Sequence, residues 1–541
     1  MSQNQDQRQD KSWTVMVYLA GENNLAEECI YALKEMRRAR PRRGSEREIE
    51  KRVKVIAQLD ASGLGGSEAR YILDGTDVDG DLGKRVIATR DTSETSYRSV
   101  LKDFVSTSIV EKNGDGLAKY YMLVLSGHGG GVARSDFLSR DVESPDTLSI
   151  PKIQWVLQQV REDVAEMREK RKATGGNSGT EPFRINVLGL DSCLMSMAEI
   201  GYELREYVDF MVGAEGFEPN TGWPYERILS DILTEHEELE PRRLAEMVVS
   251  KYVTYYSDFL PAGRSVDQAA NDLRVMRGQS EFVVRMKNLS DVLKRKLDDK
   301  ESRRHILLAH WEAQSYKDDQ YVDLYDFCDL LDRSPDRPEG DEESSVILRG
   351  VTVDPEIVKA CRWVKAVLKH KPDPVIIKSC YSGPAVQHSH GLSIYFPWSD
   401  VIESYRDLEF ARDTGWLDFL EKYVEKTRRE RRKCPDETQQ TVPLRSKLCY
   451  NPRLSGFDFL PAENKDVPLR SRVLGNNVGT MKNPALDYVT CACVTPESTA
   501  GGDESAEKSE ESDTPNPNTP PPVEEHVRTK TRKKGSSTPK K

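Results

Sequence analysis

The feature that most constrains the fold is an alternation of short apolar runs and helical patterns over the first 235 residues. The run "WTVMVYLAG" (13–21) is apolar throughout, which is typical of a strand buried on both faces of a parallel sheet. The same strand-then-helix order recurs, with further strands expected at 53–60, 120–129, 183–193 and 209–216. Alternation of this kind predicts an α/β domain with a mainly parallel central sheet flanked by helices.

An acidic segment, "TDVDGDLG", separates two short strand patterns, "ARYILDG" and "KRVIAT", that we expect to pair as a hairpin or at a sheet edge. Asp77, Asp79 and Asp81 alternate in this segment, as the ligands of a calcium loop do. However, Leu82 stands where an EF-hand needs glycine, and no glutamate closes the loop. We therefore interpret the segment as an acidic turn.

The chain of 541 residues is too long for one ordinary core. We expect the α/β domain at 12–235, a mostly helical subdomain at 236–430, a loop-rich extension at 431–495 and a charged tail at 496–541. The tail has almost no apolar residues and cannot form a core, so we expect it to be disordered. Its acidic part precedes a basic end, and both a solubilising tail and an interaction arm remain open.

Charge and hydropathy exclude several classes of partner. The net charge of −11 argues against nucleic-acid binding, because phosphate contacts need a basic surface. No apolar run approaches the roughly 20 residues that span a bilayer, so we expect no membrane partner. The first residues, "MSQNQDQRQDKSW", contain no apolar stretch that would serve as a signal peptide, and we expect a cytoplasmic location.

The sequence contains nine cysteines, and an odd number without an export signal predicts free thiols in a reducing compartment. Cys434, Cys449, Cys491 and Cys493 lie in the extension and include a Cys-x-Cys. Their spacing lacks the Cys-x-x-Cys pairs of zinc ribbons, so we expect no metal there.

Two of the expected strands end in motifs with candidate catalytic residues, "LSGHGG" and "GLDSCLM". Side chains alternate along a strand, so Asp191 and Cys193 point the same way. Ligands of parallel α/β sheets bind at the carboxyl ends of the strands. If these two strands are neighbours, His128 and Cys193 project into one crevice, with Asp191 one layer below the cysteine.

The surroundings of Cys193 suit a nucleophile. A helical pattern, "LMSMAEIGYELREY", follows it directly, and the amides at a helix N-terminus lower the pKa of a thiol. A cysteine in that place beside a histidine is an arrangement used in nucleophilic catalysis. The glycines after His128 let backbone amides approach a substrate carbonyl, so the amides of Gly129 and Cys193 are candidate oxyanion donors.

His128 and Cys193 are each compatible with roles other than catalysis. Taken singly, a cysteine at a strand end is usually a buried apolar residue, and a histidine in a glycine turn is usually structural. "HGGG" also occurs as an oxyanion motif in some lipases and esterases, but these need a Gly-x-Ser-x-Gly elbow, which the sequence lacks. The histidine precedes the cysteine, as in caspases, whereas papain-type enzymes have the opposite order. Their joint occurrence at two strand ends therefore favours cysteine catalysis.

Six motifs together resemble the clostripain family of cysteine peptidases: "VMVYLAGENNL", "LSGHGGG", "LGLDSCLMSMAEIGYEL", "GWPY", "YVDLYDFCDLL" and "HGLSIYFP". They follow the family's order over roughly residues 12–425. The resemblance implies the caspase-like fold shared with gingipains, legumain and separase, with 236–430 as an accessory subdomain of the peptidase unit. It also implies a dyad of His128 and Cys193, and cleavage after Arg or Lys with Asp191 at the base of the specificity pocket. A carboxylate there pairs with a guanidinium or ammonium group.

The sequence departs from the family in three places. Relatives are often exported, whereas no signal peptide is visible here. Before "GWPY", where relatives show Ser-Glu-Glu and then Pro-Gly, this chain has "AEGFEPNTGW", which leaves Glu215 as the candidate second pocket contact. The extension beyond about residue 430 has no counterpart in the family.

The resemblance also implies self-processing and, in some members, calcium dependence, although the sequence itself requires no cofactor. The candidate autocleavage sites are the basic residues Arg134, Arg140, Arg168, Lys170, Arg171 and Lys172. The alternative for the last four is a solvated helix end whose positive charges suit the helix dipole. We expect a monomeric endopeptidase that acts on proteins or peptides; a catalytically silent binding or scaffold protein of the same fold is the alternative.

Overall fold

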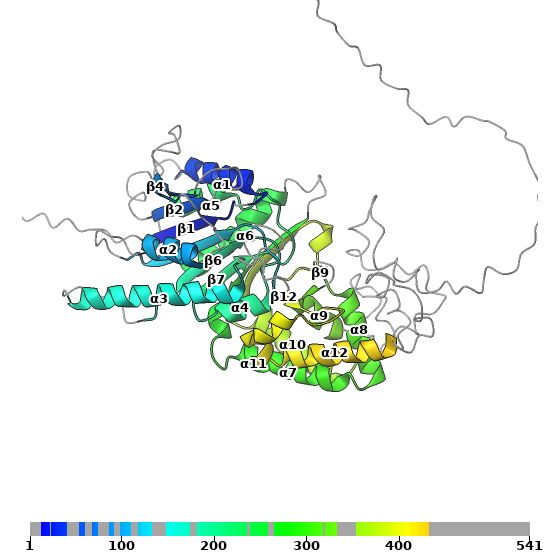
Figure 1. The fold of residues 1–541 in the computed structure, drawn as a ribbon. Helices are drawn as coiled ribbons and strands as arrows, with labels where there is room; N and C mark the ends of the chain where they lie inside the picture. Colours follow the sequence, from blue (N-terminus) through cyan, green and yellow to red (C-terminus); the bar gives the residue numbers. More distant parts are fainter. Residues whose placement is uncertain are drawn as a thin grey trace, which may run out of the picture. The chain divides into compact units, whose positions relative to one another are not determined.

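A nine-stranded sheet runs through the part of the chain that the computed structural model describes (Figure 1). The strands lie in the order β11-β8-β7-β6-β5-β1-β2-β3-β4. Their bounds are Trp13–Leu19 (β1), Val53–Leu59 (β2), Glu68–Leu73 (β3), Val86–Arg90 (β4), Tyr120–Ser126 (β5), Ile185–Asp191 (β6), Val208–Gly213 (β7), Val266–Asp272 (β8) and Ile376–Ser382 (β11). The described residues are 12–21, 23–40, 53–59, 68–73, 86–90, 98–109, 117–132, 148–173, 181–234, 239–257, 265–316, 320–332 and 353–431.

The centre of the sheet is parallel. Strands β7, β6, β5, β1 and β2 pair in parallel, while β3 and β8 run antiparallel to their neighbours on the two sides. All seven residues of β1 are buried, as the apolar run predicted. The prediction of a mainly parallel sheet is confirmed, and so is the antiparallel pair at one edge, formed by β3 and β4.

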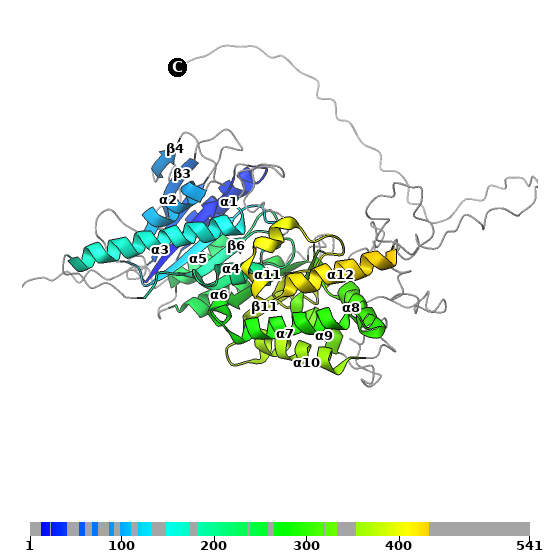
Figure 2. The same ribbon diagram turned by 60° about the horizontal axis from the view of Figure 1, so that its bottom comes forward.

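Helices cover both faces of this sheet (Figures 1 and 2). Side chains of β1 alternate between two apolar cores, with Met16 and Tyr18 in one and Val15 and Val17 in the other. The first core includes α2, α3 and α4, and the second includes α1, α5 and α6. Their bounds are Ala26–Arg38 (α1), Arg98–Ile109 (α2), Ile150–Ala173 (α3), Ala198–Leu204 (α4), Tyr225–Thr234 (α5) and Pro241–Ser257 (α6).

The region after residue 235 contributes β8 and β11 to the same sheet, and it also forms a small three-stranded sheet in the order β12-β10-β9. The small strands are Ser315–Tyr316 (β9), Tyr321–Asp323 (β10) and Ser393–Tyr395 (β12). The remaining helices gather beside it (Figure 2): Glu281–Lys296 (α7), Lys300–Glu312 (α8), Leu324–Asp332 (α9), Pro355–Lys365 (α10), Glu409–Asp413 (α11) and Trp416–Arg431 (α12). The proposed domain boundary at residue 235 remains a prediction. Strands β8 and β11, which follow that residue, belong to the same sheet as the strands before it.

Several expectations lie outside the described residues. They concern the acidic segment "TDVDGDLG", the candidate sites Arg134 and Arg140, and everything from residue 432 onward, which includes the charged tail. Within the described part, the five cysteines are free thiols, as predicted. No helix in that part combines the length and the apolarity that a bilayer crossing requires.

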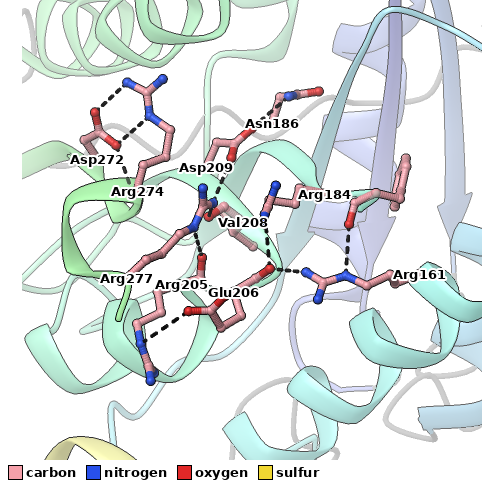
Figure 3. Close-up of polar contacts among 11 residues, drawn as sticks. Arg161, Arg184, Asn186, Arg205, Glu206, Val208, Asp209, Asp272, Arg274 and Arg277 are labelled. Atoms are coloured by element: carbon pink, nitrogen blue, oxygen red, sulfur yellow. Dashed lines mark hydrogen bonds and ion pairs between the residues drawn. The ribbon is translucent and has the colours of Figure 1, made fainter. Parts of the chain in front are cut away.

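A set of arginines fixes the end of α4 where the chain turns into β7 (Figure 3). Arg161 on α3 donates to the carbonyl oxygen of Glu206, and Nε of Arg184 donates to the same oxygen at 3.3 Å. Nε of Arg277 donates to the carbonyl oxygen of Arg205, the C-cap residue of α4, at 2.7 Å, and Nη2 of Arg277 donates to the carbonyl oxygen of Val208 in β7 at 2.9 Å. Carbonyl groups at a helix C-terminus lack partners within the helix, and guanidinium groups supply the missing donors. This turn is therefore held rigidly at the end of the sheet remote from the β6 carboxyl end.

Candidate active site

The register of the parallel strands β1, β5 and β6 places their carboxyl ends side by side at one edge of the sheet. β5 pairs with β6 so that Ser126 stands opposite Asp191, and it pairs with β1 so that Leu19 stands opposite Ser126. Beyond the strands, the amide of Gly127 donates to the carbonyl oxygen of Asp191 at 3.2 Å. The expectation that the histidine and cysteine follow neighbouring strands is confirmed.

A pocket opens at these strand ends, as expected for a parallel α/β sheet. His128, Asp191 and Cys193 all line it, together with one face of α1, which contributes Glu28, and the segment that begins at Glu218. The structure thus brings three of the predicted residues into one cavity. Two acidic side chains join them that the sequence did not single out.

Cys193 is partly buried and is held by the backbone of Glu218. The amide of Glu218 donates to Sγ at 3.3 Å, and Sγ lies 3.8 Å from the carbonyl oxygen of the same residue. Burial raises the pKa of the Cys193 thiol, and the Glu218 amide opposes the shift only partly. The thiol is therefore protonated in this state of the molecule.

The expectation that a helix N-terminus lowers the pKa of Cys193 is wrong. The helix α4 begins only at Ala198. The amide of Leu194 donates to Gly216 at 2.9 Å and that of Ser196 donates to Ala214 at 2.8 Å, so both amides pair with the segment after β7. Leu194 has a φ of 65°, a left-handed conformation that is costly for a leucine. Long-range pairing has therefore overridden the local helical pattern.

His128 contacts a residue that the sequence reasoning missed. Its Nε2 lies 2.6 Å from Oδ1 of Asn24, in the turn before α1. Burial lowers the pKa of His128, and the charge of Glu28 opposes the shift. The imidazole is therefore neutral at neutral pH, and the thiol and the imidazole do not form a preformed ion pair.

Gly129 packs directly on the nucleophile loop. A Cβ at this position would lie 2.2 Å from the carbonyl oxygen of Cys193 and 3.1 Å from its amide nitrogen. Only glycine permits this approach, which gives the glycine run after His128 a steric reason. The backbones of the two motifs are in contact, and the role of their amides as oxyanion donors stays a prediction.

Asp191 and Glu218 form the acidic base of the pocket. Asp191 is buried and its Oδ2 accepts a hydrogen bond from the hydroxyl of Tyr225 at 2.6 Å. Burial raises the pKa of Asp191, while burial and the charge of Asp191 raise the pKa of Glu218 well above its ordinary value. The Glu218 carboxyl is thus the group that holds a proton when the pocket is empty. A hydrogen bond between the two carboxyl groups through this proton lowers the pKa of Asp191 and raises that of Glu218. Apart from this shared proton, Asp191 Oδ1 and Glu218 Oε2 have no hydrogen-bond donor among the described residues.

Glu215, the expected second pocket contact, lies elsewhere. It is fully buried, its Oε2 accepts from the amide of Gly391 at 2.6 Å, and its own amide donates to Asp267 at 2.7 Å. Glu215 does not line the pocket; Glu218, three residues further along the same segment, does. The segment "AEGFEPNTGW" does line the pocket, from Glu218 onward, and a single sequence carries no signal that separates its two glutamates.

The basic candidates for autocleavage lie in the last turns of α3. Arg168 donates to the carbonyl oxygen of Glu181 at 2.6 Å, and Lys170 forms an exposed ion pair with Glu166 at 2.6 Å. Their helical conformation differs from the extended one that a peptidase cleft accepts. No cluster of three or more His, Cys, Asp and Glu side chains in the described part of the chain is arranged to hold a metal ion.

Comparisons with known proteins agree with this fold. The sequence profile of the clostripain family matches residues 17–423. A secreted C11 cysteine protease from Bacteroides thetaiotaomicron, solved with an irreversible peptide inhibitor, is similar in fold with a TM-score of 0.50 at 16% identity, over 75% of this chain and 99% of that one. An inactive zymogen C11 protease from Parabacteroides distasonis has a TM-score of 0.46 at 16% identity, with the same coverage of 75% and 99%. No curated protein matches the sequence.

The fold and the family match define a cysteine peptidase of the caspase-like type, which acts on peptides or proteins. The chain belongs to the clostripain family.

The expectation of a cytoplasmic location is contradicted. The protease from Bacteroides thetaiotaomicron is described as secreted, and its relationship in fold to this chain points away from the cytoplasm. The expectation had rested on the composition of the first residues alone, and we do not retain it.

Proposed function

We propose that this clostripain-family protein is an endopeptidase that cleaves after Arg or Lys, with Cys193 as nucleophile and His128 as general acid and base. One observation carries the proposal: the register that places Ser126 opposite Asp191 brings the thiol, the imidazole and a pair of buried carboxyl groups into one pocket. Each of these groups has a distinct task in peptide hydrolysis.

In the first half of the reaction, Sγ of Cys193 attacks the scissile carbonyl carbon while its proton passes to His128. The C–N bond breaks, and His128 returns the proton to the leaving amine, which leaves an acyl-enzyme. Water then attacks the acyl carbon and His128 takes a proton from it. The C–S bond breaks, the carboxyl product leaves, and His128 returns the proton to the sulfur of Cys193, which restores the thiol. The raised pKa of Cys193 and the lowered pKa of His128 support a resting state in which both groups are neutral.

The oxyanion that forms on the scissile carbonyl needs backbone donors. We assign this task to the amides of Gly129 and Cys193, whose backbones are in contact. The steric fit of Gly129 against Cys193 supports the assignment, because a side chain at residue 129 would separate the two loops.

The specificity for basic residues is assigned to Asp191 together with Glu218. Apart from the proton that Glu218 shares with Asp191, each carboxyl group has one buried oxygen without a donor among the described residues. A guanidinium group offers five N–H donors in a plane, and an ammonium group offers three. A substrate Arg or Lys side chain would therefore satisfy both oxygens and replace the proton on Glu218 with its own charge.

Two further properties follow from the family resemblance and belong to the proposal: self-processing after a basic residue and calcium dependence. A monomeric state belongs to the proposal as a separate expectation. The exposed basic end of α3 supports self-processing. Adding calcium or a chelator to each assay decides the calcium requirement.

The test is a panel of fluorogenic peptides that end in Arg, Lys or Ala before the leaving group, with and without calcium. Cleavage of the Arg and Lys peptides only, together with labelling of Cys193 by an arginyl acyloxymethylketone, is the expected result. Cysteine→alanine substitution at residue 193 should abolish both. Absence of turnover and of labelling would favour the silent scaffold instead.

A further inference from the structure

His128 has a hydrogen-bond partner that the proposed dyad does not use. Its Nε2 lies 2.6 Å from Oδ1 of Asn24. An amide oxygen only accepts hydrogen bonds, so this contact requires the proton to be on Nε2. In a neutral imidazole the lone pair is then on Nδ1. The contact therefore selects one of two tautomers.

The position of Asn24 is built into the fold. The amide of Ala20 donates to the carbonyl oxygen of Ser126 at 3.0 Å, so the pairing of β1 and β5 continues to the ends of both strands. The amide of Leu25 donates to Oδ1 of Asn23 at 2.8 Å, and Nδ2 of Asn23 donates back to the carbonyl oxygen of Ala20 at 3.2 Å. This side chain closes a turn of the kind that asparagine favours, and the turn presents Asn24 to the loop after β5.

We propose that Asn24 is a positioning residue, whose amide oxygen holds His128 in the Nε2–H tautomer and aims Nδ1 at the reacting atoms. The proposal rests on the dyad proposed above. The thiol proton then moves to Nδ1 and from there to the leaving amine, while Nε2–H remains bonded to Asn24 throughout. The amide is neither oxidised nor protonated, so the step needs no further reactant.

An amide suits this task better than a carboxylate would. Asn24 orients the ring without adding negative charge, so the imidazole stays in the neutral form that accepts a proton. The negative charge of Glu28 on α1 raises the pKa of His128, whereas burial lowers it. A carboxylate in place of Asn24 would add to the effect of Glu28 and favour the imidazolium before substrate binds.

The first experiment reads the tautomer directly and needs no activity. The full chain is labelled with ¹⁵N-histidine, and the imidazole signals of His128 are assigned by comparison with His128→Ala. We expect the Nε2–H tautomer in the native protein, a mixture of tautomers in Asn24→Ala, and retention of Nε2–H in Asn24→Asp. An Nδ1–H tautomer in the native protein, or an unchanged spectrum in Asn24→Ala, would overturn the proposal.

The second experiment measures kinetics per titrated active site. Asn24→Ala should lower kcat on an Arg substrate about 10- to 100-fold with little change in KM, less than the loss of all general acid–base catalysis. Asn24→Asp should recover part of kcat. Because a carboxylate raises the pKa of His128, the acid limb of the pH profile of kcat should move to higher pH in this variant. Asn186→Ala is the matched control, because Asn186 lies at the opposite end of β6 and donates to Asp209 at 2.9 Å; its kcat should be native.

A purely structural role for Asn24 would lower the fraction of active enzyme and leave kcat per titrated site unchanged, which would contradict the proposal. Native protein that cleaves no basic substrate would remove the proposed function, and the tautomer measurement would still decide the role of Asn24.

Discussion

The backbone of Glu218 closes on the sulfur of Cys193, with the amide nitrogen 3.3 Å and the carbonyl oxygen 3.8 Å from Sγ. The side chain of the same residue enters the pocket beside Asp191. One residue therefore touches the proposed nucleophile with its backbone and lines the proposed specificity pocket with its carboxyl group. Entry of a basic side chain into the pocket is expected to act on the thiol through this residue.

The two pocket carboxyl groups should differ in their contribution to specificity. Asp191→Asn should lower kcat/KM on Arg peptides about 10- to 100-fold, because a hydrogen bond to a charged group contributes about 1.5–3 kcal/mol. Glu218→Gln should lower it less, because Glu218 is protonated in the empty pocket and the amide resembles that form. Initial rates on Arg, Lys and Ala peptides measure both effects. An Asp191→Asn enzyme that still prefers Arg would refute the pocket assignment.

The thiol of the substrate-free enzyme should react slowly at neutral pH. Burial raises the pKa of Cys193 from an ordinary value of 9.0, so the rate of alkylation by iodoacetamide should keep rising above pH 9. Mass spectrometry of the Cys193 peptide after timed alkylation gives the profile, with denatured protein as the control for an unperturbed thiol. A plateau reached near neutral pH would reveal a thiolate–imidazolium pair and contradict the neutral resting state.

The sequence predicted the parts of the fold and site that depend on local pattern. The apolar runs located the central strands, and the alternation of side chains placed Asp191 and Cys193 on one side of β6. For His128 and Cys193 to face the same crevice, β5 and β6 then had only to be adjacent in the sheet. These are short-range inferences, and the register of Ser126 opposite Asp191 confirms them.

The features that the sequence did not predict depend on contacts between distant segments. Helix α4 begins at Ala198, later than the sequence pattern predicted, because the amides of Leu194 and Ser196 donate to carbonyl oxygens in the segment after β7. Glu218 lines the pocket and Glu215 does not, because the Glu215 carboxyl group accepts a hydrogen bond from the amide of Gly391, which is distant in the sequence. Local pattern carries no information on such partners.

A buried carboxyl group on α4 should make the stability of the protein depend on pH. Burial raises the pKa of Glu199 from 4.5 to about 7, so its protonated form is favoured in the folded state. This contribution is fully present below pH 4.5 and is lost as the pH rises through about 7. Glu199→Gln should remove the part of the dependence that Glu199 contributes and stabilise the protein at pH 8 by up to about 3 kcal/mol relative to native. Glu203, whose pKa is also raised to about 7, and Asp267, raised to about 6, keep the remainder.

Urea unfolding at pH 5 and pH 8 tests this expectation. Glu199 Oε1 accepts from the amide of Tyr395 at 2.9 Å and from the hydroxyl of Tyr405 at 2.8 Å, and a glutamine oxygen preserves both bonds. Glu403→Gln is the control: the Glu403 side chain is 93% exposed, so this variant should match native stability at both pH values. A Glu199→Gln protein less stable than native at both pH values would count against the assigned protonation.

Self-processing should be visible as a chain break after a basic residue that requires Cys193. The helical candidates are Arg168, Lys170, Arg171 and Lys172, and their turn of α3 must unwind before an extended segment enters the pocket. Arg134 and Arg140 are the other candidates, and they precede α3 in the chain. Mass spectrometry of native protein over a time course, beside Cys193→Ala, gives the sites and their order. Fragments that form equally in Cys193→Ala would assign the cleavage to another protease, and an intact native chain would exclude self-processing.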